Sequence, residues 1–134
     1  MDFDKFLKFH KSKNTLITIC MRPLPKGYKS SSVITLDDDK KIKVFLEKPT
    51  MEQIEQFKDE QSYINSGIYA MKKDVLNLIP ENQKYDLSKD LFPKLIGEGI
   101  PLYGYSTTEF FREIGRVEKY NAFLEEVKGK KEFL

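Results

Sequence analysis

The chain contains almost no cysteine or histidine, with only Cys20 and His10 among its 134 residues. One cysteine cannot form a disulfide within the chain, and one cysteine with one histidine cannot complete a zinc site of the Cys/His type. The lack of paired cysteines favours a reducing compartment, so we expect a cytoplasmic protein. Cys20, in an apolar run, is predicted to be a core residue and His10 to be solvated, and neither is expected to be catalytic.

The chain also lacks a strong net charge and any long hydrophobic run. Its 23 Lys and Arg minus 21 Asp and Glu give +2, which provides neither a broad basic surface nor an acidic tail. No stretch approaches the roughly 18 apolar residues of a membrane span, and the opening MDFDKFLKFH does not resemble a signal peptide. We therefore expect a soluble protein with no nucleic-acid or membrane partner.

What the chain does contain is the composition and patterning of a globular domain, with 40% hydrophobic and 33% charged residues. Its length predicts one domain, residues 1–134. Apolar spacing and turn residues predict helices and strands that alternate along most of the sequence. The predicted helices are 2–12, 51–58, 74–79, 86–96 and 116–128. The predicted strands are 16–21, 32–36, 41–47, 63–71, 102–105 and 110–114.

This alternation predicts an α/β fold, in which the hairpin 32–47 makes the sheet mixed and helices flank it. Strand 16–21 is almost wholly apolar, which predicts a central strand covered on both faces. The last helix is expected to pack inward through a stripe of Val117, Tyr120, Phe123, Leu124 and Val127. An alternating fold normally places a strand before its first helix, so we expect that the start of the domain is missing.

The first candidate site is Glu47-Lys48-Pro49, which ends a strand whose preceding residues are apolar. Ligands collect at strand ends in α/β sheets. Lys48 could hold a phosphate as a point charge, and Glu47 could accept hydrogen bonds from hydroxyl groups. The alternative is an ordinary solvated charge pair at a strand exit.

The second candidate site lies inside strand 63–71. Asn65 offers both a donor and an acceptor, and Gly67 lets a ligand approach the backbone. A β-bulge without a ligand is the alternative. The third candidate is Glu113, a carboxylate between an apolar strand and a helix, which suits an oxygen-ligated magnesium ion. A lone, exposed glutamate is the alternative there.

Five segments taken in order resemble the later part of a sugar-1-phosphate nucleotidylyltransferase. The segments are FLKFHKSKNTLITICMRP, SVITLDDDKKIKVFLEKP, YINSGIYAMKKDVLNLIP, DLSKDLFPKLIGEGIPLYGY and FFREIGRVEKYNAFLE. Within that family, the pattern most resembles the mannose- or heptose-1-phosphate guanylyltransferases and the glucose-1-phosphate thymidylyltransferases. The resemblance implies a Rossmann-like, three-layer domain that couples a sugar 1-phosphate to a nucleoside triphosphate and releases pyrophosphate with Mg²⁺.

The resemblance also implies roles for individual residues. Glu47 is expected to contact sugar hydroxyls, and Lys48, the expected catalytic residue, to contact the sugar phosphate. Asn65 and Gly67 are expected to line the sugar pocket. Glu113 stands where the family usually has an aspartate that helps to bind the metal.

Several features depart from the family pattern. Asp2-Phe3-Asp4 matches the residues just beyond the family's Gly-Asp metal site, so we expect the Gly-rich nucleotide loop and that site to be absent. Arg116-Val117 replaces the usual Thr-Pro, and Ser30-Ser31 replaces a region that often has glycine. We therefore expect the sugar-phosphate-binding half alone, weak or inactive by itself, and self-associated or completed by another chain. The alternative is a non-catalytic sugar-phosphate-binding or dimerisation module.

Overall fold

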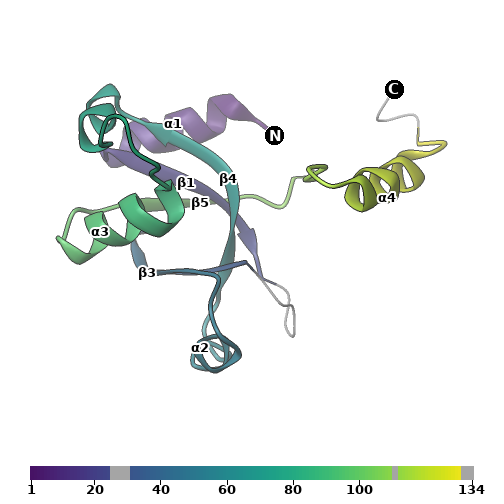
Figure 1. The fold of residues 1–134 in the computed structure, drawn as a ribbon, viewed down its shortest axis with the longest axis horizontal. Coiled ribbons are helices and arrows are strands. Elements are labelled where there is room, and N and C mark those ends of the chain that lie inside the picture. The colour runs from purple at the N-terminus through teal and green to yellow at the C-terminus, as the bar shows by residue number, and fades with distance from the viewer. Residues whose placement is uncertain (25–30, 110–111, 131–134) are drawn as a thin grey trace.

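The computed structural model of the chain describes residues 1–24, 31–109 and 112–130. Within these residues the strands form one five-stranded sheet in the order β3-β2-β4-β1-β5 (Figure 1). The predicted fold class, an α/β arrangement with a mixed sheet and flanking helices, is confirmed. The strands are β1 (Ile17–Pro23), β2 (Ser32–Leu36), β3 (Ile42–Glu47), β4 (Tyr63–Met71) and β5 (Tyr103–Ser106).

The sheet is mixed because its neighbouring strands run in both directions. β1 is antiparallel to β4 and parallel to β5, while β2 and β3 form the predicted antiparallel hairpin. β1 has a partner on each side and residues 17–21 are all buried, so the predicted central strand is confirmed. The hairpin joins β4 at one register pair, Ile34 opposite Tyr63. This junction brings the end of β3 near β4.

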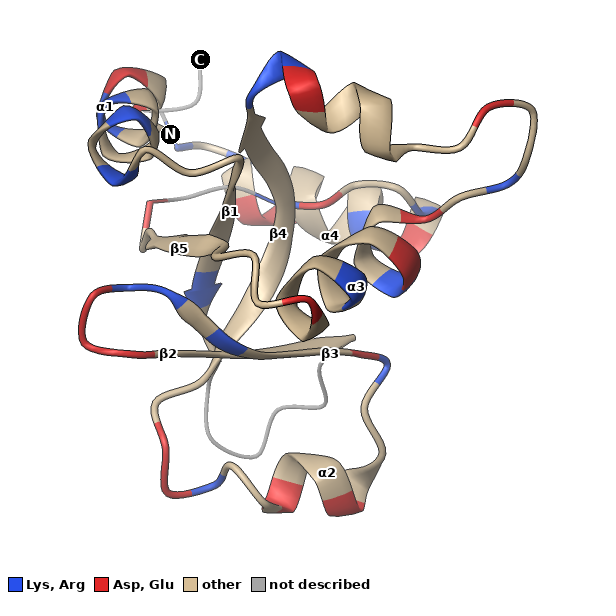
Figure 2. Ribbon diagram, turned by 90° about the vertical axis from the view of Figure 1, so that its left-hand side faces the viewer, with Lys and Arg blue, Asp and Glu red and all other residues tan. Residues whose placement is uncertain are grey.

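Helices cover both faces of the sheet (Figure 1). On one face α1 packs Phe6 against Cys20 and Ala70, and on the other α3 contributes Phe92 and Leu95 to the main core. Charged residues of both signs are interspersed over the helices and connections (Figure 2). The helical segments are α1 (Phe3–Lys13), α2 (Met51–Glu55), η1 (Lys73–Leu78), η2 (Leu87–Leu91), α3 (Phe92–Gly97) and α4 (Val117–Val127).

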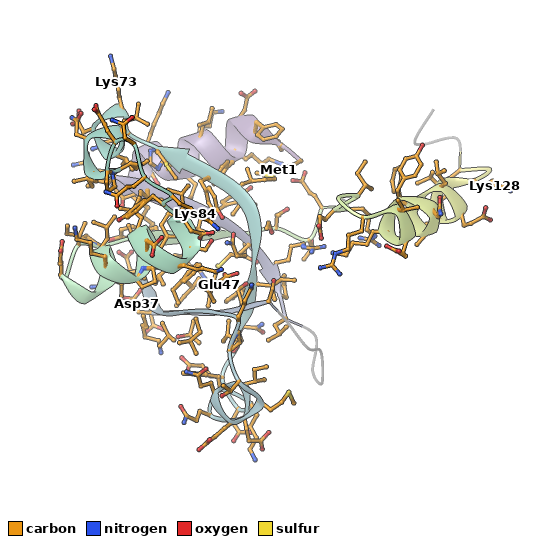
Figure 3. All side chains as sticks on the ribbon, in the orientation of Figure 1. Met1, Asp37, Glu47, Lys73, Lys84 and Lys128 are labelled. Atoms are coloured by element: carbon orange, nitrogen blue, oxygen red, sulfur yellow. The ribbon has the colours of Figure 1, made fainter. Side chains whose placement is uncertain are left out.

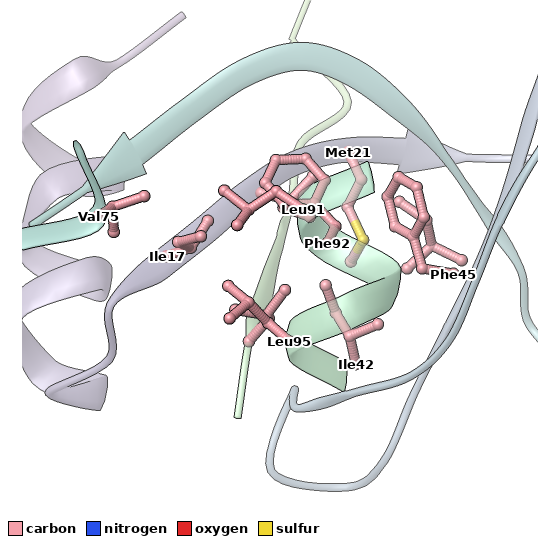
Figure 4. Packing of buried hydrophobic residues seen from close by; sticks show 11 residues of the cluster. Ile17, Met21, Ile42, Phe45, Val75, Leu91, Phe92 and Leu95 are labelled. Atoms are coloured by element: carbon pink, nitrogen blue, oxygen red, sulfur yellow. The ribbon is translucent and has the colours of Figure 1, made fainter. Parts of the chain in front are cut away.

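The main core lies between the sheet and α3, as Figure 4 shows. Phe92 is fully buried, and its ring packs edge-on against Phe45 of β3 at 5.5 Å and Tyr69 of β4 at 5.0 Å between centroids. Edge-to-face aromatic pairs add to the free energy gained from burial alone. These contacts fix α3 over the strands β3 and β4, which carry two of the candidate sites.

The predicted helix 86–96 is two different helical segments. Residues Leu87–Leu91 form a π-helical turn, and α3 follows with Pro93 in its first turn. Proline has no N–H to donate, so it leaves one carbonyl of the preceding turn without its usual partner. Asp86 caps this segment by accepting hydrogen bonds from the N–H groups of Ser88 at 2.8 Å and Lys89 at 2.9 Å. The cap fixes the start of η2.

The prediction that the last helix packs inward is wrong. Val117 is 71% exposed, Tyr120 45% and Leu124 43%, and Figure 1 shows α4 projecting away from the sheet. An amphipathic pattern identifies the apolar side of a helix but not a surface that covers it. The predicted strand 110–114 lies partly outside the described residues, and residues 112–114 do not form a strand.

The prediction that His10 is solvated is also wrong. The residue is 8% exposed, and its Nδ1 lies 2.8 Å from Thr18 Oγ1 on β1. Burial is the main cause that lowers the pKa of His10, and the positive charge of Lys72 lowers it further. The helical register of α1, rather than the charge of the neighbouring residues, turns this side chain towards the sheet.

Candidate functional site

The ends of three strands bring Glu47 and Asn65 into one row across the sheet. Glu47 of β3 is the register partner of Ser32 on β2. Ser32 Oγ in turn accepts a hydrogen bond from the backbone N–H of Asn65 on β4, at 2.8 Å. Figure 3 shows Glu47 beside the body of the sheet, away from Lys128 at the end of α4. Two of the sequence-predicted positions are therefore joined through one serine.

Glu47 is half-buried, with charged groups from two elements around it. Burial raises the pKa of the Glu47 carboxyl, and the negative charge of Asp86 raises it further, while Lys48 and Lys89 oppose this shift. Phe45, two residues earlier on β3, packs against Phe92. Since alternate residues of a strand share a face, Glu47 lies on the α3 side of the sheet.

Lys48 leaves β3 with an unusual backbone conformation. Its φ is +49°, in the left-handed region, and its N–H donates to the carbonyl of Ser31 at 2.6 Å. A non-glycine residue in this region is uncommon and is worth examination at a candidate site. The Lys48 side chain is exposed. The backbone turn therefore directs a flexible cation into solvent beside Glu47.

Asn65 and Gly67 form a β-bulge, one of the alternatives for this strand. The register with β1 shifts here, so that Cys20 pairs with Ile68 but the next residue, Met21, pairs with Asn65. Gly67 has a φ of +76°, which favours glycine, and its N–H donates to Asn65 Oδ1 at 2.9 Å. The bulge alone explains the glycine, and contact with a ligand stays a prediction.

The side-chain amide of Asn65 also reaches two hydroxyl groups. Its Nδ2 donates to Tyr69 Oη at 2.9 Å and to Ser88 Oγ of η2 at 3.2 Å. The members of this cluster that were not predicted from the sequence are Ser88, Asp86 and Tyr69. Asp86 followed by an apolar stripe is a helix-start signal, which could have placed Ser88 in the first turn of η2 but not beside Asn65.

Glu113 has different charged neighbours. It forms an ion pair with Lys119 of α4, and this contact is the main cause that lowers the pKa of the Glu113 carboxyl. Near it, Arg112 forms a two-pronged pair with Glu126, at 3.0 and 2.7 Å. A hollow of about 310 Å³ lies here, lined by Arg22, Arg112, Glu113, Lys119, Ala122, Phe123 and Glu126.

The surroundings of Glu113 do not by themselves make a magnesium site. Magnesium demands near-octahedral oxygen coordination, and one exposed carboxylate paired with a lysine supplies a small part of it. Among residues 1–24, 31–109 and 112–130, no three His, Cys, Asp or Glu side chains are grouped so that they could hold a metal ion. A metal role for Glu113 stays a prediction. In the same ranges, no helix has the length and apolar character needed to cross a membrane.

Comparison with known proteins decides the family. The model of the nucleotidyl transferase family matches residues 1–129. The chain belongs to this family. The resemblance seen in the sequence is thereby confirmed, and the match extends from α1 through α4.

Among the curated relatives of this nucleotidyl transferase chain, a UTP–glucose-1-phosphate uridylyltransferase of Synechocystis is 38% identical over 121 residues. That match covers 90% of this chain and 30% of the relative. A glucose-1-phosphate adenylyltransferase of Clostridium novyi is 34% identical, covering 88% of this chain and 31% of the relative. A mannose-1-phosphate guanylyltransferase of Mycobacterium tuberculosis is 25% identical, covering 89% of this chain and 31% of the relative. The chain thus spans about 30% of their length.

A solved structure supports the fold. HddC from Yersinia pseudotuberculosis, complexed with GMP-PN, superposes with a TM-score of 0.66 at 21% sequence identity. The superposition covers 94% of this chain and 49% of the HddC chain. The nucleotidyl transferase chain therefore shares its mixed sheet and flanking helices with part of that molecule.

Proposed function

We propose that this chain forms the sugar-phosphate-binding part of a nucleotidyltransferase that joins a sugar 1-phosphate to a nucleoside triphosphate. Membership of the nucleotidyl transferase family supports this proposal. So do the names of the relatives, which act on glucose 1-phosphate or mannose 1-phosphate. Because the chain spans a minor part of those relatives, the proposal assigns it the binding of one substrate rather than the complete reaction.

The observation that carries the proposal is the row Glu47–Ser32–Asn65. Glu47 and Asn65 are separated by the loop that contains α2, yet strand pairing and one hydrogen bond bring them to the same edge of the sheet. A carboxylate and an amide at a shared strand end suit a ligand with several hydroxyl groups. The exposed Gly67 leaves open space beside this row, because a Cβ atom there would meet no atom within 4 Å.

In the proposed reaction an oxygen of the sugar phosphate attacks the α-phosphorus of the nucleoside triphosphate. A new P–O bond forms, the bond between the α-phosphorus and the bridging oxygen breaks, and pyrophosphate leaves. Lys48 holds the attacking phosphate as a point charge, while Glu47 and Asn65 orient the sugar. Catalysis of this kind consists mainly of positioning and neutralisation of charge.

Magnesium is part of the proposal only as a requirement of the complete reaction. When bound, the ion neutralises charge that develops on the transferred phosphates. Glu113 as a ligand requires that its ion pair with Lys119 opens and that further oxygen ligands come from outside the described residues. No step assigned to this chain runs through the metal.

A binding experiment tests the proposal. The chain is titrated with glucose 1-phosphate and with mannose 1-phosphate in a calorimeter. One of the two should show saturable binding. Lys48→Ala removes the positive charge proposed to hold the sugar phosphate. It should weaken binding about tenfold or more, since charge-assisted hydrogen bonds are stronger than neutral ones. Lys94→Ala, on the exposed side of α3, is the matched control and should bind as the parent chain does.

Two outcomes contradict the proposal. The first is no binding of either sugar phosphate, and the second is equal loss of affinity in the Lys48 and Lys94 variants. A turnover assay with nucleoside triphosphates then separates the complete enzyme from the alternative, a non-catalytic binding module. Rapid release of pyrophosphate by the isolated chain would contradict the expectation that it is weak or inactive alone.

A further inference from the structure

Every hydrogen of the Asn65 side-chain amide already has a partner within the protein. Nδ2 carries two hydrogens, and it donates to Tyr69 Oη at 2.9 Å and to Ser88 Oγ at 3.2 Å. Oδ1 accepts from the N–H of Gly67 at 2.9 Å. An amide oxygen has two lone pairs, so one acceptor position of Oδ1 is left after this bond.

The orientation of this amide follows from chemistry. The oxygen and nitrogen of an asparagine amide are distinguished by their hydrogen-bond partners. The N–H of Gly67 can only donate, so the atom that faces it must be Oδ1. The other end is therefore Nδ2, and the two hydroxyl oxygens that face it accept. The bulge at Gly67 and the first turn of η2 together fix the amide.

We propose that Asn65 meets its ligand as a hydrogen-bond acceptor only, and that Ser88 and Tyr69 are the positioning residues that impose this polarity. The inference rests on the proposed function, because it describes how the same site selects its sugar. Glu47, when ionised, is also an acceptor only. The row Glu47–Asn65 therefore selects hydroxyl groups that donate, and discriminates against groups that can accept but cannot donate.

Tyr69 is the more rigid of the two supports. Its ring packs edge-on against Phe92 at 5.0 Å between centroids, and Phe92 is fully buried. Ser88 is held by η2, where its own N–H donates to Asp86 at 2.8 Å. Ser88 is therefore the better position for substitution, since its half-exposed side chain carries little of the core.

One test of the network needs no ligand. In nitrogen-15 NMR spectra of the whole chain, the two Nδ2 hydrogens of Asn65 should both exchange slowly with solvent. Ser88→Ala should accelerate the exchange of one hydrogen and leave the other protected by Tyr69. Ser12→Ala, which removes an exposed hydroxyl bonded to Phe9 at the far end of α1, is the matched control. Unchanged exchange in Ser88→Ala overturns the proposed positioning role.

The second test measures the polarity of the site with sugar 1-phosphates. Deoxy and deoxyfluoro analogues of glucose 1-phosphate are titrated into the chain, one hydroxyl position at a time. Fluorine can accept weakly but cannot donate. At the position that meets Asn65, the deoxy and deoxyfluoro analogues should both bind about tenfold more weakly than the parent sugar, the loss of one hydrogen bond in a site.

Variants at Ser88 give a result that a merely structural role does not. Ser88→Ala frees one Nδ2 hydrogen of Asn65, which can then donate to fluorine. The loss of affinity of the deoxyfluoro analogue relative to the parent sugar should therefore be smaller in this variant. Ser88→Thr, which keeps the hydroxyl group, should restore the full loss. A deoxyfluoro analogue that binds as well as the parent at every position overturns the inference and leaves the proposed function standing. Failure of the chain to bind any sugar 1-phosphate contradicts the proposed function itself, and the inference with it.

Discussion

The backbone N–H of Asn65 donates to the hydroxyl oxygen of Ser32 at 2.8 Å, joining β4 to β2 just beyond their single register pair. The two strands are thus joined by one backbone register pair and by one hydrogen bond to a side chain. Ser32 is 1% exposed and is also the register partner of Glu47. The same serine therefore joins the hairpin to β4 and sets the spacing between Glu47 and Asn65 in the candidate site.

Ser32→Ala should lower both stability and affinity. The substitution leaves the half-buried N–H of Asn65 without its hydroxyl partner, which costs about 1 kcal/mol in the free energy of unfolding. Urea denaturation measures this change, and calorimetry with a sugar 1-phosphate should show weaker binding in the same variant. Ser12→Ala, at an exposed position, should change neither quantity. Unchanged stability of Ser32→Ala would contradict the proposal that this serine joins β2 to β4.

Glu47→Gln should stabilise the chain while it weakens ligand binding. The pKa of Glu47 is raised in the folded state by burial and by Asp86. Stability from this group is therefore present below the ordinary pKa and is lost as the pH rises through the folded pKa. At neutral pH the ionised carboxylate opposes folding, and a neutral amide removes that cost. Denaturation at pH 7.5 and pH 4 should show the gain at the higher pH only.

The control for that experiment is Glu98→Gln, at an exposed position after α3. It should leave the free energy of unfolding and the affinity unchanged at both pH values. Equal behaviour of the two glutamine variants would mean that the surroundings of Glu47 are ordinary solvent.

His10 should make the chain less stable in mild acid. Its pKa is lowered in the folded state, mainly by burial, so the unfolded chain binds a proton at a pH where the folded chain does not. The free energy of unfolding should therefore fall as the pH drops below the ordinary value of 6.5. In His10→Gln the decline between pH 7 and pH 5 should be smaller. His10 is the single histidine of the chain, which isolates the effect.

Phe92→Ala should damage the core and the site together. Removal of a fully buried phenylalanine costs about 3–5 kcal/mol. The loss also frees the ring of Tyr69, whose hydroxyl accepts from Asn65. Leu95→Ala removes another buried side chain of α3 without an aromatic contact to Tyr69. At temperatures where both variants are folded, binding of a sugar 1-phosphate should be weaker in the Phe92 variant than in the Leu95 variant.

Val117→Lys should have almost no effect on the isolated chain. Val117 is 71% exposed on α4, and substitutions at exposed positions usually change stability by about 0.5 kcal/mol or less. A thermal melt measures the difference. A large loss of stability would mean that the apolar side of α4 is covered in solution, as the sequence pattern alone had predicted.

Local patterns predicted most of the secondary structure. The apolar run around Ile17–Met21 marks a central strand because a strand buried on both faces has no polar alternation. The predicted helix 74–79 stops before Pro80, because proline has no N–H to donate and cannot continue a helix. The same patterns proposed Glu47, Asn65 and Gly67 as special positions, because polar residues and glycine interrupt otherwise apolar strands.

The sequence by itself determined the family, the mixed α/β fold and the residues at which the strands become polar, since these depend on the order and type of neighbouring residues. Only the tertiary structure decided that Ser32 links Glu47 to Asn65, that Ser88 and Tyr69 fix the Asn65 amide, and that His10 is buried while α4 is not. Such contacts join residues far apart in the chain, and periodicity along a segment reports which side is apolar, not which partner meets it.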